Sequence, residues 1–143
     1  MENMFTTIDH VAIAYPDLDE AIKYYTEVMG WQMIHREVNE EQGVAEAMMC
    51  PVSPVGALQT QVQLIAPTRE DATVAVWLSK NKPGMHHIAW RVEDIDAVSA
   101  QLREQGIVLL YDQARHGTNN SRINFMHPKS ANGVLTEIVE PAK

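Results

Sequence analysis

Two stretches of the chain place apolar residues at the spacing of an amphipathic α-helix. These residues are Ala21, Ile22, Tyr25 and Val28 in the first stretch, and Ala97, Val98 and Leu102 in the second. Asp17 and Asp94 precede the two stretches and suit helix N-caps, because a short acidic side chain accepts a hydrogen bond from a first-turn amide. Gly30 and Gly106 follow them and suit the left-handed turn that ends many helices. The pattern therefore predicts two similar, well-delimited helices.

Three short stretches with strand character follow each predicted helix. They are Gln32–Glu37, Val44–Met49 and Thr60–Ala66 after the first, and Ile107–Asp112, Ser121–His127 and Val134–Val139 after the second. A further helix is expected over Thr73–Lys80, between the two groups.

The chain also repeats itself, which is a strong indicator of architecture. Ile8–Ala12 resembles Met85–Ala89, 77 positions later, and Gln63–Pro67 resembles Glu137–Pro141 at an offset of 74. We therefore predict an α+β protein in which two βαβββ units pair into a curved, half-open mixed β-sheet. Residues 1–67 would form the first unit, 68–83 a linker helix and 84–143 the second unit of one domain.

Composition and charge narrow the function. The 143 residues are 45% hydrophobic and 21% charged, as in ordinary globular proteins, and the net charge is −8. A negatively charged protein without a basic patch is not expected to bind nucleic acid. The chain has no apolar run of about 20 residues to cross a membrane and no secretion-signal pattern at its start. With a single cysteine, Cys50, we expect a cytoplasmic protein.

Four polar side chains occupy equivalent places in the repeat. His10 and His87 lie near the start of each unit, and Gln63 and Glu137 lie on its last predicted strand. One strand histidine alone is more often structural than a ligand, but a matched pair with matched polar partners indicates a shared site. Two imidazoles, an amide oxygen and a carboxylate suit Co²⁺, Mn²⁺, Ni²⁺ or Zn²⁺, and Mg²⁺ less well. The repeat therefore predicts a divalent-metal site.

The chain resembles the vicinal oxygen chelate superfamily, which has a glyoxalase-like fold, and within it the methylmalonyl-CoA epimerase family. The matching stretches are Ile8–Ala12, Glu41–Val44, Met85–Val92, Arg122–Ser130 and Gly133–Glu137. The resemblance implies that His10, Gln63, His87 and Glu137 bind the metal, most often cobalt, and that the protein is a homodimer.

The same resemblance implies epimerisation of (R)- and (S)-methylmalonyl-CoA through a metal-stabilised enolate. Glu46 and Glu137 would be the acid/base pair, one on each face of the substrate, because inversion needs a group on both sides. By its own pattern Glu46, between Val44 and Met48 on one strand face, is expected at a solvent-facing edge more than in a pocket. The segment that contains His127, Lys129 and Ser130 is either an acyl-CoA contact or a plain turn.

Alternatives remain open from the sequence. A glyoxalase-type isomerase would use similar metal chemistry, and a small-molecule-binding protein on the same scaffold would use none. An Fe²⁺ dioxygenase usually has two histidines and one carboxylate, so the fourth polar residue, Gln63, argues against it. His35 and Arg36 are expected to be solvated at a strand end, and His86 to pack on the face opposite His87.

Overall fold

A computed structural model of the chain describes residues 4–52 and 60–143. The chain forms two compact units. The N-terminal unit is His10–His86, and the C-terminal unit is His87–Lys143 together with the segment that ends at Asp9. The chain therefore passes between the units inside two strands, β1 (Ile8–Ala14) and β5 (Gly84–Arg91).

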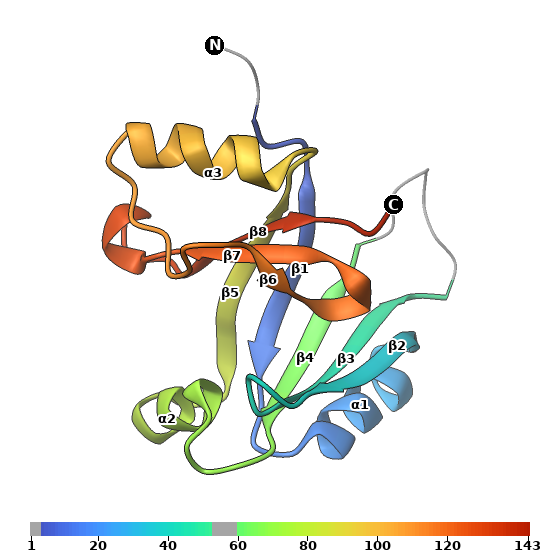
Figure 1. Cartoon of the computed structure of the whole chain (residues 1–143). Helices are drawn as coiled ribbons and strands as arrows, with labels where there is room; N and C mark the ends of the chain where they lie inside the picture. The colour runs from blue at the N-terminus through green and yellow to red at the C-terminus, as the bar shows by residue number, and fades with distance from the viewer. Residues whose placement is uncertain (1–3, 53–59) are drawn as a thin grey trace. The chain divides into compact units, whose positions relative to one another are not determined.

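In the N-terminal unit the sheet has the order β2-β3-β4-β1 (Figure 1). The bounds are β2 (Trp31–Asn39), β3 (Val44–Pro51) and β4 (Val62–Pro67). Strands β2, β3 and β4 are antiparallel neighbours, and β4 runs parallel to β1. Helices α1 (Leu18–Glu27) and α2 (Thr73–Lys80) complete the unit.

Opposite faces of this sheet are covered by different helices. Leu18, Ala21 and Tyr25 of α1 are buried against the face that carries Ala47 and Leu64. Val74 of α2 is instead packed with residues of the other face: Ala12, Ala14, Val44 and Ile65. Because side chains alternate along a strand, Glu46 and Gln63 lie on the face away from α1.

In the C-terminal unit the sheet order is β5-β8-β7-β6. The further strands are β6 (Arg115–His116), β7 (Arg122–Met126) and β8 (Thr136–Glu140), with short 3₁₀ turns η1 (Thr118–Asn120) and η2 (Pro128–Ser130). Helix α3 (Ile95–Glu104) buries Ile95, Val98 and Leu102 against Ile138. Ala89, Ile123 and Val139 form a cluster on the opposite face.

The predicted helix signals are confirmed. Asp17 accepts a hydrogen bond from the amide of Glu20, and Asp94 accepts one from the amide of Ala97. Gly30 and Gly106 have φ values of 71° and 83°, in the left-handed region that favours glycine. The α+β class and the order strand, helix, then strands in both halves are likewise confirmed.

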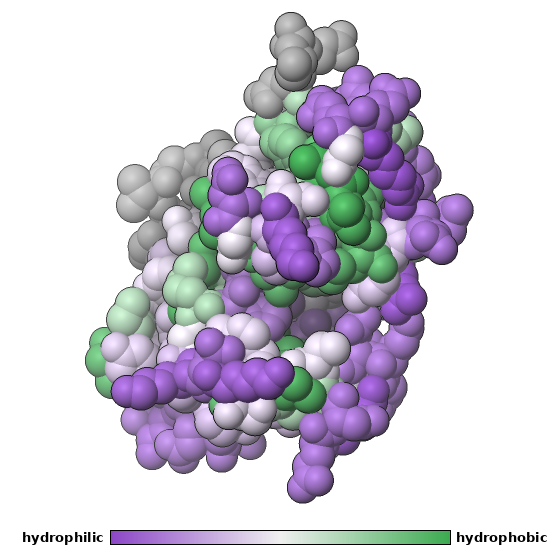
Figure 2. Space-filling model, turned by 90° about the vertical axis from the view of Figure 1, so that its left-hand side faces the viewer, coloured by the Kyte–Doolittle hydropathy of each residue, from purple (hydrophilic) through white to green (hydrophobic). Residues whose placement is uncertain are grey.

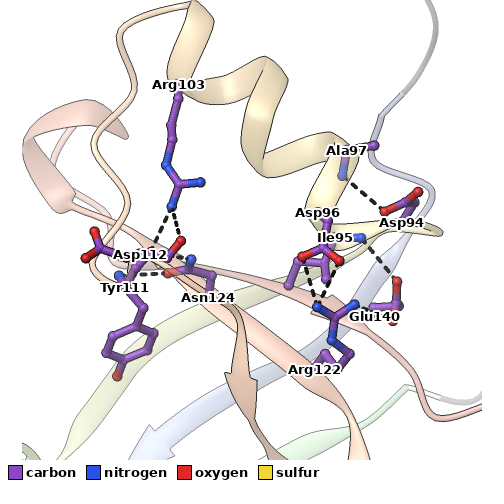
Figure 3. A network of polar contacts seen from close by, with 10 residues as sticks. All are labelled: Asp94, Ile95, Asp96, Ala97, Arg103, Tyr111, Asp112, Arg122, Asn124 and Glu140. Atoms are coloured by element: carbon purple, nitrogen blue, oxygen red, sulfur yellow. Dashed lines mark hydrogen bonds and ion pairs between the residues drawn. The ribbon is translucent and has the colours of Figure 1, made fainter.

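The strand predicted over Ile107–Asp112 is wrong. Only an isolated bridge forms there, between Leu109 and Met126. The amide and carbonyl of Tyr111 are bound by the side chain of Asn124, and the carbonyls of Tyr111 and Asp112 accept from Arg103 (Figure 3). Side chains therefore take the backbone groups that a strand ladder would need.

The surface mixes polar and apolar side chains, as Figure 2 shows for one face. Large apolar residues with exposed side chains include Val28, Ile34, Val38, Met85, Val108 and Val134. Within the two described ranges, no helix has both the length and the apolarity that a membrane span requires.

Candidate active site

The two parallel strand pairs have the same register. Ala12 of β1 lies opposite Gln63 of β4, and Ala89 of β5 lies opposite Glu137 of β8. These positions are equivalent in the sequence repeat, so the duplication extends to the pairing of individual residues. In each unit a histidine two residues before the alanine shares its face with the polar residue of the partner strand.

The C-terminal half-site consists of His87 and Glu137. Nε2 of His87 lies 3.1 Å from Oε2 of Glu137, and each residue is only 7% exposed. Phe125 lies opposite Glu137 in the ladder, and its ring meets the His87 ring edge to face at 5.4 Å between centroids. Packing by Phe125 therefore restricts how the imidazole can turn.

The N-terminal half-site consists of His10 and Gln63, each 3% exposed. The shared register places them diagonally on one sheet face, as His87 and Glu137 are placed. Met48 lies opposite Gln63 across the β3–β4 pair, and Glu46 lies opposite Ile65. Glu46 is therefore a diagonal neighbour of Gln63 on the same face, and it is partly buried.

The donor set fits a divalent ion of intermediate hardness. His87 Nε2 and Glu137 Oε2 are 3.1 Å apart, so both atoms would be available to one ion. His10, His87 and Glu137 are all buried, and they have the chemistry to hold a metal ion.

The segment with His127, Lys129 and Ser130 forms a hydrogen-bonded turn. Nδ1 of His127 accepts from the amide of Lys129 at 3.1 Å, and Oγ of Ser130 accepts from the amide of Val108 at 3.0 Å. The Lys129 side chain is exposed. His127 and Ser130 therefore have structural bonds, and their contact with a substrate stays a prediction.

Sequence reasoning missed the supports of the C-terminal half-site. Asn124 is fully buried, and its Oδ1 accepts from the amides of Tyr111 and Phe125 at 3.1 and 2.8 Å. An asparagine within a strand sequence was the available signal, because a fully buried amide needs several partners.

A second missed support anchors the start of α3 to β8. Arg122 binds Asp96 with two contacts of 2.9 Å and Glu140 with one of 3.4 Å (Figure 3). Glu140 also accepts from the amide of Ile95 at the first turn of the helix. The hydrogen bond to Asp96 is the main reason that the pKa of Arg122 is raised above its ordinary value.

The remaining histidines have separate places. The ring of His86 packs edge to face on Trp77 at 5.1 Å, as expected for a residue facing away from His87. His116 is exposed on β6. His35, expected to be solvated, is partly exposed and lies 3.1 Å from Glu37.

Comparison with known proteins shows which family has this fold and sequence. The family model described as Glyoxalase/Bleomycin resistance protein/Dioxygenase superfamily matches residues 9–125. A crystal structure of selenomethionine-labelled methylmalonyl-CoA epimerase is 56% identical, with a TM-score of 0.92 over 100% of both chains. The chain belongs to the methylmalonyl-CoA epimerase family.

Two other relatives of the family are informative. A methylmalonyl-CoA epimerase solved in complex with methylmalonyl-CoA and ammonium is 47% identical, with a TM-score of 0.90 over 96% of each chain. The ethylmalonyl-CoA/methylmalonyl-CoA epimerase of Cereibacter sphaeroides is 34% identical over 94% of this chain and 98% of its own length. The resemblance to this epimerase family, found from sequence motifs, is thereby confirmed.

Proposed function

We propose that the protein interconverts (R)- and (S)-methylmalonyl-CoA. Its support is a relative that covers 96% of the chain and binds methylmalonyl-CoA. The relative from Cereibacter sphaeroides is named for both ethylmalonyl-CoA and methylmalonyl-CoA. One methylene changes pocket binding by about 1–3 kcal/mol, so we expect a preference between these substrates that is modest in size.

We propose further that His10, Gln63, His87 and Glu137 hold one divalent ion. The observation that carries this proposal is the shared register, which places a histidine and a polar partner on one face in each unit. Glu137 alone would be explained as an ionic partner of His87. Gln63 is neutral and cannot serve His10 in that way, but its amide oxygen is a suitable ligand. A metal site accounts for both halves, and an ion pair accounts for one.

The chemistry requires an acid and a base on opposite faces of the α-carbon. When bound, the ion supplies Lewis-acid stabilisation of the negative charge that develops on the substrate oxygens. Glu46 is assigned to one face, where it removes or returns the α-proton. Glu137 is assigned to the other face, and the second oxygen of its carboxylate is suited to proton transfer while Oε2 is directed at His87.

The decisive experiment is exchange of the α-proton with solvent deuterium, followed by NMR, with and without a chelator. We expect epimerisation and deuterium incorporation in the untreated protein, loss of both after chelation, and recovery with cobalt. The protein should also be offered a glutathione hemithioacetal. Glyoxalase activity without epimerase activity would contradict the proposal.

The shared ion has its own test in the thermal stabilisation by cobalt. An ion at 100 times its dissociation constant stabilises a folded protein by about 2.7 kcal/mol. His10→Ala and His87→Ala should each remove most of that stabilisation, and the double variant should lose little more. His86→Ala is the matched control, because this adjacent side chain packs on Trp77. Equal and additive losses would indicate two separate ions.

Further parts of the proposal follow from the family. We infer a homodimer, which the exposed apolar side chains of β2, Ile34 and Val38, support, and light scattering measures the mass. We keep His127, Lys129 and Ser130 as contacts to the acyl-CoA. The units 1–67 and 84–143 with a linker over 68–83, and the cytoplasmic location, also stay predictions.

A further inference from the structure

Each turnover of a two-base epimerase leaves its two bases with exchanged protonation states. If Glu46 takes the α-proton and Glu137 returns one from the other side, Glu46 ends protonated and Glu137 ends ionised. A second turnover in the same direction cannot begin until Glu46 has lost its proton to solvent and Glu137 has regained one. Since Glu46 is partly buried, its proton needs a route to water. This requirement rests on the function proposed above.

Strand β2 places a second carboxylate directly beside Glu46. In the β2–β3 ladder Glu37 lies opposite Glu46, and His35 lies opposite Met48. Residues that face each other in an antiparallel pair have Cβ atoms about 4.5–5.5 Å apart, on one side of the sheet. Glu37 and Glu46 are therefore neighbours on the face away from α1.

The imidazole of His35 lies next to Glu37 on the same strand. Nε2 of His35 lies 3.1 Å from Oε2 of Glu37, and the two side chains are 31% and 29% exposed. Glu46, Glu37 and His35 thus lead from a partly buried carboxyl to a side chain that reaches solvent. Histidine is the side chain best suited to exchange protons with water near neutral pH.

The arrangement depends on an irregularity in β2. The register shifts between Met33 and His35, so Ile34 is an extra residue in this strand. Without the shift, the residues beyond it would present opposite faces, because side chains alternate along a strand. Arg36, between His35 and Glu37 in the sequence, lies on the opposite face and binds Asp19 of α1 at 2.9 Å.

We propose that Glu37 and His35 carry the proton between Glu46 and solvent. Glu46 passes its proton to the ionised carboxylate of Glu37, and Glu37 passes it to Nε2 of His35. His35 then releases a proton from Nδ1 to water or buffer. Glu46 and Glu37 are thereby back in their starting states, and proton exchange of the imidazole with solvent restores the starting tautomer of His35. Both residues act through Glu46 and do not touch the substrate.

The test compares His35→Gln and Glu37→Gln with the unaltered protein, each loaded with cobalt. We expect kcat at saturating methylmalonyl-CoA to fall about tenfold or more in both variants, because proton return becomes limiting. We expect kcat/KM to change less than about twofold, because it reports the first proton abstraction. Added imidazole should restore kcat, as a small base in solution takes the place of the missing relay.

Arg36→Gln is the matched control, since it removes a charged side chain from the same strand on the opposite face. It should leave kcat unchanged and insensitive to imidazole. An unchanged kcat in either relay variant would overturn the proposal, and so would an equal fall of kcat and kcat/KM that imidazole does not restore. If the unaltered protein does not epimerise the substrate, the proposed function itself fails, which is a distinct result.

Discussion

Replacing Asn124 by alanine should destabilise the C-terminal unit severely. Its side chain is fully buried and makes three hydrogen bonds of 2.8–3.1 Å, two with the backbone of Tyr111 and one with the amide of Phe125. A net contribution of about 1 kcal/mol for each gives a loss of about 3 kcal/mol. For a chain of this length that corresponds to a fall in Tm of about 10 °C.

The assay is thermal unfolding and urea unfolding followed by circular dichroism, with Asn39→Ala as control. Asn39 is partly buried, and its Oδ1 accepts one hydrogen bond, from the amide of Gln42 at 3.0 Å. We expect Asn39→Ala to cost about 1 kcal/mol or less. If Asn124→Ala loses no more stability than Asn39→Ala, the explanation given for the irregular chain at Tyr111 is refuted.

Three further predictions concern separate positions. Glu46→Gln should retain cobalt but lose deuterium exchange at one face of the α-carbon, and NMR showing undiminished exchange at both faces would remove Glu46 from the mechanism. Burial raises the pKa of Tyr25 above its ordinary value of 10. The contribution of the neutral Tyr25 phenol to stability is therefore complete below that pH and is lost as pH rises through the folded pKa. Tm should fall less between about pH 10 and 11.5 in Tyr25→Phe than in the unaltered protein. Gly117→Ala should lower the free energy of unfolding by about 1–3 kcal/mol, because the new Cβ would lie 2.6 Å from a methyl of Ile123. In Gly84→Ala the nearest atom to the new Cβ would be 3.9 Å away. Urea titration should therefore show little change in the free energy of unfolding of Gly84→Ala.

The repeat is the part of the fold that the sequence predicted best. Local signals such as the caps Asp17 and Asp94 depend on neighbouring residues only, and they are confirmed. The two half-sites were also predictable, because equivalent positions in a repeat acquire equivalent pairing. Their assignment as metal ligands and of Glu46 as a base stays a prediction.

Other features were beyond sequence reasoning because they depend on distant partners. The apolar character of Ile107–Asp112 favours a strand, but Asn124 and Arg103 compete for its backbone groups. The position of Glu37 opposite Glu46 depends on one extra residue in β2, which no local pattern of polar and apolar residues specifies. Secondary-structure propensity depends on the residues of the segment itself, whereas strand pairing also depends on the residues that the segment contacts in the fold.

The matched register of β1–β4 and β5–β8 has an evolutionary consequence. A duplicated gene first yields two identical halves, and substitutions then accumulate in each copy independently. Gln63 and Glu137 occupy equivalent positions in the two strand pairs. Exchanging an amide for an acid at either position changes the formal charge by one unit and conserves the length of the side chain. Descendants of one ancestral duplication can thus diversify in reactivity through a single codon, without rebuilding the scaffold.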